Sequence, residues 1–220
     1  MAAMLAGVEA GYGLELDVQM SADGEAMVFH DHTLDRLTER TGPVDALDAA
    51  ALGGLALAGT NETIPTLAAV LEAVAGRASV LVEVKDRSLR YEPTDGRLED
   101  RVAEVAAAHP DVAVMSFNPH SVARMHEAAP ALPRGLTAYD FRHPSEDHLT
   151  EARRTALAGM ADFDAVGASF VSYGAHCLSG AAPLRSRGVP VYCWTVRSAA
   201  QAEAVAPLCD QITFEGFSPP

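Results

Sequence analysis

Two carboxylates alternate with apolar residues in the segment 13–18, and their spacing suits them to binding a cation. Glu15 and Asp17 are two residues apart, so on a strand their side chains project from one face about 6 to 7 Å apart. Like charges at that distance repel by about 2–3 kcal/mol at an effective dielectric constant of about 20. The segment therefore predicts either a site for a hard divalent cation such as Mg²⁺ or Ca²⁺, or a half-exposed antiparallel strand with a solvated acidic face.

A third carboxylate favours the cation. Glu83 lies between Val82 and Val84 in the apolar run 79–85, where an uncompensated charge costs several kcal/mol or is lost by protonation. Three inward-facing acids form an oxygen-only ligand set of the kind that Mg²⁺ and Ca²⁺ prefer. Lys85 is two residues from Glu83 and points to the same face, so it is expected to neutralise part of the acidic charge.

A histidine is expected near the same rim. Residues 21–24 have the composition of a turn, and residues 25–30 predict a second strand that pairs with the first as a hairpin. His30 ends that strand and is followed by Asp31. It is either a proton-transfer group or a loop histidine that caps a turn.

From residue 79 onwards strands and helices alternate, and apolar strands separated by helices predict a covered parallel sheet. The repeat predicts an α/β protein with a TIM (β/α)8 barrel. Seven strands begin such units, and the sequence opens on a helix that ends near Gly11, so we expect the first strand and its loop to precede Met1. The alternative is a seven-stranded or open doubly wound sheet. Strands are expected at 112–117, 135–139, 166–171, 189–196 and 211–215, and helices at 66–75, 97–108, 119–128, 146–158, 177–186 and 198–206.

Composition limits the class of protein. The 220 residues, of which 49% are hydrophobic, suit a single domain over 1–220 with a polar loop insertion at about 33–63. A net charge of -14 argues against binding to nucleic acid or anionic membranes. No apolar run is as long as a membrane span, and the start lacks the features of a signal peptide, so we expect a cytoplasmic protein.

The three cysteines, Cys177, Cys193 and Cys209, have no C-x-x-C spacing and are expected to be buried thiols. His176 follows a predicted strand and is a possible rim residue.

Short motifs in a specific order run the length of the chain. They are Gly13-x-Glu15-x-Asp17-Val18, Asp23-Gly24, His30-Asp31-x-x-Leu34-x-Arg36, Thr41-Gly42, Ile64-Pro65-Thr66-Leu67, Glu83-Val84-Lys85, Ser116-Phe117 and Trp194-Thr195-Val196. Together these motifs resemble the glycerophosphodiester phosphodiesterase family, which has a TIM barrel with a divalent metal at its C-terminal mouth.

The resemblance implies hydrolysis of a small-molecule glycerophosphodiester to glycerol 3-phosphate and an alcohol. It implies that Glu15, Asp17 and Glu83 bind the Mg²⁺ or Ca²⁺ cofactor, that Lys85 contacts the phosphate, and that His30 is one of two acid/base histidines. The other belongs to a His-Arg-Gly motif on the family's first strand, which we expect ahead of Met1. Trp194, the only tryptophan, is either a core residue or part of the alcohol pocket.

Two other functions remain open. A phospholipase D-like relative on the same barrel is expected to carry apolar rim loops, whereas residues 33–63 are mostly polar. A non-catalytic metal- or ligand-binding barrel is expected to lack one of the two histidines.

Overall fold

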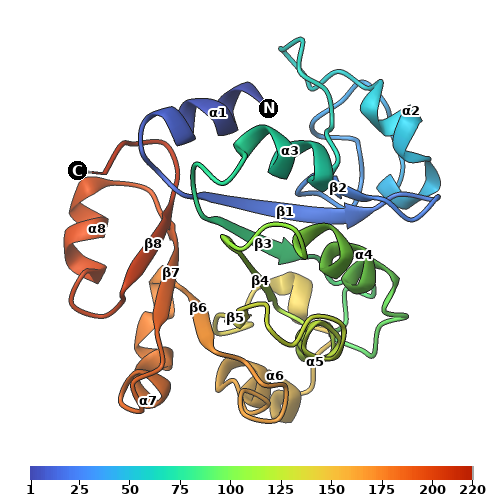
Figure 1. Cartoon of the computed structure of the whole chain (residues 1–220). Helices are drawn as coiled ribbons and strands as arrows, with labels where there is room; N and C mark the ends of the chain where they lie inside the picture. Colours follow the sequence, from blue (N-terminus) through green and yellow to red (C-terminus); the bar gives the residue numbers. More distant parts are fainter. Residues whose placement is uncertain (220) are drawn as a thin grey trace.

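The computed structural model describes residues 1–219 and shows one curled sheet with helices around its outside (Figure 1). Its strands are β1 (Leu14–Met20), β2 (Ala26–Val28), β3 (Val80–Val84), β4 (Val112–Ser116), β5 (Arg134–Ala138), β6 (Phe170–Gly174), β7 (Val191–Val196) and β8 (Gln211–Phe214). The strand order is β2-β1-β3-β4-β5-β6-β7-β8, and all neighbours except the β1/β2 hairpin are parallel.

The sheet curls until its two ends approach each other. The ring of Tyr12, just before β1, lies 5.0 Å from the ring of Phe214 in β8, measured between centroids. The Tyr12 hydroxyl also donates to the carbonyl of Pro219 at 2.8 Å. Within residues 1–219, β8 is hydrogen-bonded to β7 alone. The predicted barrel architecture is confirmed, and the helices lie around the curved sheet rather than on both faces of an open one (Figure 1).

The α-helices are α1 (Ala2–Glu9), α2 (Ala49–Gly53), α3 (Leu67–Val74), α4 (Arg97–Ala106), α5 (Pro119–Ala128), α6 (Glu151–Ala158), α7 (Ala182–Arg185) and α8 (Ala199–Val205). Short 3₁₀ turns are η1 (Val44–Ala46), η2 (Pro144–Glu146) and η3 (Ala175–Ala181). None of the helices in the described part of the chain is both long and apolar enough to cross a membrane.

Side-chain caps decide where several helices begin. Thr66, Thr150 and Ser198 each accept a hydrogen bond from the backbone N–H three residues ahead, an interaction worth about 1 kcal/mol. The prediction of one helix over 146–158 is therefore wrong at its start. Thr150 caps α6 at Glu151, and residues 144–146 form the separate turn η2. Residues 177–186 likewise form part of η3 and then the short helix α7.

The prediction of a strand over 166–171 is also misplaced, because β6 begins at Phe170. Residues 161–167 form consecutive turns in which the Val166 N–H donates to the Asp162 carbonyl at 3.0 Å. Gly167 has a φ of +64°, which interrupts an extended chain. Val166 is buried because this turn packs on the core. An apolar residue at this position therefore indicates burial in a turn and not a strand.

The alternation in β1 and β3 separates an apolar face from a polar one. Leu16, Val18, Val82 and Val84 pack in the core between the sheet and the helices. The residues between them, including Glu15, Asp17 and Glu83, must therefore face the inside of the curled sheet.

Residues 33–63 fold over the hairpin with a small core of their own. Isolated bridges join Thr33 to Pro43 and Ala56 to Thr63, and α2 lies between them. These bridges and the packing of its apolar side chains give the segment a defined structure. Leu34, Val44 and Leu52 of this segment pack in one buried apolar cluster with Met27, Phe29 and Ile64, which flank it in the sequence.

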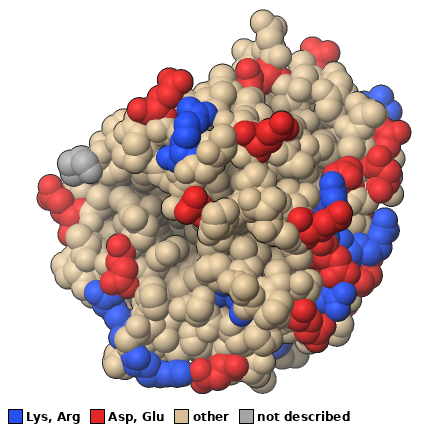
Figure 2. All heavy atoms as spheres, in the orientation of Figure 1, with Lys and Arg blue, Asp and Glu red and all other residues tan. Residues whose placement is uncertain are grey.

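Acidic and basic side chains alternate on the surface around α4 and α5 (Figure 2). Arg101 pairs with Glu25 and Glu104, and Arg124 pairs with Asp100. These pairs disperse the charge of this surface instead of gathering cations into a patch.

Candidate active site

Four ionisable side chains meet on the inner face of β1 and β3. Asp17 and Glu83 are register partners on the two parallel strands. The Lys85 ammonium donates to Asp17 Oδ1 at 2.6 Å and to Glu83 Oε1 at 2.7 Å. Carboxylate oxygens of Glu15, Asp17 and Glu83 all lie within 4.8 Å of one another. The structure thus brings together the three predicted metal ligands and the predicted phosphate contact.

Burial and neighbouring charges decide which groups of this cluster are ionised. Burial raises the pKa of Glu15 to about 8, and the neighbouring charges of Asp17 and Glu83 add to the shift. Burial likewise raises the pKa of Glu83. For Lys85, burial lowers the pKa, but Glu83 and Asp17 outweigh it and hold the pKa above its usual value. At neutral pH, and without a further cation, Glu15 is therefore mostly protonated while Lys85 stays charged.

This donor set fits a hard divalent cation. Three ionised carboxylates and one ammonium leave two negative charges, which a divalent ion neutralises. The converging atoms are all oxygens, as Mg²⁺ and Ca²⁺ prefer.

Asp31 holds the imidazole of His30 in place by a hydrogen bond. Its Nδ1 lies 2.7 Å from Asp31 Oδ1, and Asp31 also accepts two hydrogen bonds from Arg36, at 2.7 and 2.8 Å. Arg36 lowers the pKa of Asp31 to about 2, with a smaller contribution from His30. An ionised carboxylate only accepts, so Nδ1 carries the proton and Nε2 is left for chemistry. The side chain of His30 is 62% exposed.

Two neighbours of His30 escaped prediction. Gln19 continues the inner-face alternation of Glu15 and Asp17, and its amide donates to the His30 carbonyl at 3.1 Å and lies 3.4 Å from His32 Nδ1. Burial lowers the pKa of His32, and the positive charge of Lys85 adds to the effect. The period-two pattern from residue 15 to 19 was the available signal for Gln19. No sequence signal marks His32.

A buried acid fixes the loop that follows Lys85. Asp86 accepts hydrogen bonds from the backbone N–H of Tyr91 at 2.6 Å and of Arg90 at 3.1 Å, and from the Asn118 amide at 3.1 Å. Asn118 is fully buried at the start of α5, so this contact ties the end of β3 to the end of β4. The sequence offered no signal for the contact with Asn118 because the two residues are 32 positions apart.

Aromatic side chains form a wall along three other strands of the sheet. Phe117 follows β4, Tyr139 follows β5 and Trp194 lies in the second half of β7, with ring centroids 5.3 to 6.0 Å apart. The Trp194 indole donates to the Ser172 carbonyl at 3.1 Å and remains partly exposed. Trp194 therefore packs on its neighbours and also keeps part of its surface exposed.

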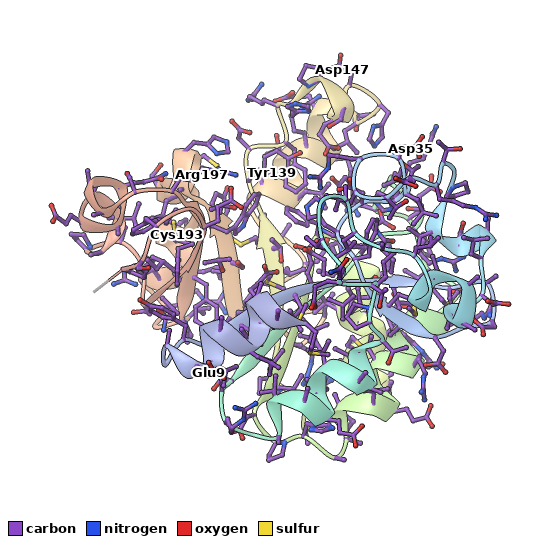
Figure 3. All side chains as sticks on the ribbon, turned by 90° about the horizontal axis from the view of Figure 1, so that it is seen from above. Glu9, Asp35, Tyr139, Asp147, Cys193 and Arg197 are labelled. Carbon is purple, nitrogen blue, oxygen red and sulfur yellow. The ribbon has the colours of Figure 1, made fainter. Side chains whose placement is uncertain are left out.

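The strand ends gather on one side of the molecule. In Figure 3, Tyr139 lies between Asp35, which follows β2, and Arg197, which follows β7, while Glu9 at the end of α1 lies on the opposite side. In a barrel of this class the active site lies at the C-terminal ends of the strands.

A family profile, described as the glycerophosphoryl diester phosphodiesterase family, matches residues 1–212. This chain belongs to that family. A glycerophosphodiester phosphodiesterase from Caldanaerobacter subterraneus is 33% identical over 56% of this chain and 54% of its own length. One from Bacillus altitudinis is 31% identical over 62% of this chain and 59% of its own. The chain thus spans little more than half the length of these two family members.

Solved structures of the family have the same fold. A phosphodiesterase from Oleispira antarctica, in complex with the product sn-glycerol-3-phosphate, matches with a TM-score of 0.76 and 20% identity. The match covers 96% of this chain and 83% of the other.

Proposed function

We propose that this chain hydrolyses small-molecule glycerophosphodiesters to glycerol 3-phosphate and an alcohol, using Mg²⁺ or Ca²⁺. The observation that carries the proposal is the convergence of Glu15, Asp17, Glu83 and Lys85 inside the barrel. Membership in the phosphodiesterase family supports it. So does the glycerol 3-phosphate in the structure of the Oleispira relative.

In this proposal the three carboxylates hold the divalent ion. When bound, the ion supplies positive charge that stabilises the phosphoryl oxygens in the transition state. Lys85 lies between Asp17 and Glu83, and its ammonium provides a second positive point for a phosphate oxygen. Because the carboxylates keep Lys85 protonated, it serves as a donor and not as a base.

His30 carries one of the two proton transfers. Hydrolysis breaks a phosphorus–oxygen bond to the alcohol and forms one to the incoming oxygen, so one group must remove a proton and another must supply one. Asp31 fixes the imidazole so that Nε2 is available for one of these steps. Trp194, with Phe117 and Tyr139, is proposed to line the pocket for the alcohol.

The test is a turnover assay on glycerophosphocholine, glycerophosphoethanolamine and glycerophosphoinositol, with liberated glycerol 3-phosphate as the readout. We expect turnover with Mg²⁺ or Ca²⁺, loss of turnover with a chelator, and recovery when the ion is restored. Turnover that survives complete chelation contradicts the metal assignment. Preferential cleavage of phosphatidylcholine favours the phospholipase D-like alternative, and ion binding without turnover of any diester favours a non-catalytic barrel.

We expect the chelator-treated protein to lose stability as the pH rises from 4.5 to about 8. The pKa of Glu15 rises from 4.5 to about 8 on folding, so in this range the folded state binds more protons than the unfolded one. Stability then falls with pH, by an amount on the order of a few kcal/mol. Excess Mg²⁺ should reduce this slope because bound ion keeps Glu15 ionised.

Urea unfolding at a series of pH values measures this slope. Glu15→Gln should reduce it, leaving the contribution of Glu83, whereas Glu72→Gln on the exposed face of α3 should not change it. A slope that persists unchanged in Glu15→Gln assigns the titration to another group.

A further inference from the structure

A second cluster of potential metal ligands lies at the ends of β5 and β6. Asp140, His176 and Cys177 place a carboxylate oxygen, an imidazole nitrogen and the sulfur within 4.8 Å of one another. Cys177 is partly exposed, so the expectation of a buried thiol is wrong for this residue and correct for Cys193 and Cys209. Neither the acidic cluster nor the proposed hydrolysis uses these three side chains.

The spacing suits tetrahedral coordination. Bonds of about 2.0–2.3 Å to zinc place two tetrahedral ligand atoms about 3.3–3.8 Å apart. His176 Nε2 lies 3.5 Å from Asp140 Oδ1, which falls within that range. The sulfur of Cys177 lies within 4.8 Å of a ring nitrogen of His176 and of a carboxylate oxygen of Asp140, so a shift of about an ångström completes the set.

Local backbone structure holds these ligands together. A Cβ atom at Gly174 would lie 3.1 Å from Tyr139 Cβ and 3.3 Å from His176 Cε1, so a larger residue here would crowd the imidazole where it lies at the end of β6. Asp140 Oδ1 accepts the backbone N–H of Arg142 at 3.2 Å, which orients the carboxylate. The Cys177 thiol points back to the Gly174 carbonyl, 3.6 Å away.

We propose that Asp140, His176 and Cys177 form a second metal site that binds Zn²⁺, with the fourth position open. Thiolate and imidazole ligands favour zinc-class ions over Mg²⁺ and Ca²⁺, whereas the acidic cluster offers only oxygens. A bound ion joins the segments that follow β5 and β6, next to Tyr139 in the aromatic wall. The ring centroids of Tyr139 and His176 are 6.3 Å apart.

Titration with Co²⁺ tests the site, because a thiolate ligand gives Co²⁺ a near-ultraviolet charge-transfer band that oxygen ligands do not. We expect the reduced, chelator-treated full chain to develop this band, and one equivalent of Zn²⁺ to abolish it. Excess Mg²⁺ should leave the band in place. This readout is independent of phosphodiesterase activity, so it fails or succeeds separately from the proposed function.

Variants locate the ligands. We expect Cys177→Ser to lose the band, and His176→Gln and Asp140→Asn to weaken Co²⁺ binding by about tenfold or more. His143→Gln, an exposed histidine after β5, should bind like the wild type, and Glu83→Gln should keep the band. Absence of the band in the wild type overturns the proposal, as does a band that persists in Cys177→Ser. His176 and Asp140 are at the surface, so their variants test the site even if Cys177→Ser folds poorly.

Discussion

Glu83→Gln should lower phosphodiester turnover by at least about a hundredfold and weaken Mg²⁺ and Ca²⁺ binding, because it removes the most buried of three converging charges. It also deprives Lys85 of one of its two carboxylate partners. Calorimetric titration with each ion and the glycerol 3-phosphate assay measure the two effects.

The fold should survive this substitution. Burial raises the pKa of Glu83, which means that its ionised form is disfavoured where it lies. The metal-free variant is therefore expected to unfold at the wild-type temperature or above. Glu72→Gln, which removes an exposed acid from α3, serves as the matched control and should bind the ion normally. Wild-type ion affinity in Glu83→Gln removes this residue from the site.

His30→Ala should lower turnover by about a hundredfold or more while ion binding stays intact, since general acid or base catalysis contributes about that much. The imidazole is exposed and contributes little packing, so stability should change little. Turnover measured at saturating substrate and ion separates this effect from weaker binding.

Two further variants sharpen the test of His30. Asp31→Asn keeps the shape of the neighbour but removes its charge, so the pH profile of turnover should shift while some activity remains. His126→Ala, an exposed histidine in the last turn of α5, should have wild-type turnover. If His30→Ala turns over substrate at nearly the normal rate, His30 is a structural residue of the loop.

The period-two alternation predicted which residues share the inner face. Glu15 and Asp17, with Glu83 and Lys85 on the neighbouring strand, needed only a count of residues to be placed on one side, and parallel pairing then put Asp17 beside Glu83. The hairpin of β1 and β2 was predictable from its turn, and antiparallel pairing of Val18 with Val28 confirms it.

The remaining features depend on contacts between distant parts of the chain. Val166 and its neighbours have the composition of a strand but form a turn that is buried against the core. The strand predicted from their apolar side chains was therefore placed ahead of β6, which begins at Phe170. Asp86 binds Asn118, which is 32 residues away. Asp140, which follows β5, contacts His176, which follows the neighbouring strand β6. Propensity and local spacing do not report such pairs, because each member is ordinary in its own segment.

The two hydrogen-bonded neighbours of β3 set the local stability of the strand that carries Glu83. β3 is bonded to β1 on one side and to β4 on the other, so it detaches only when two ladders break. Backbone amides of β3 should therefore be among the slowest of the sheet to exchange with solvent. Asp17 lies on β1 in register with Glu83. Local opening elsewhere in the molecule thus leaves these two carboxylates beside each other.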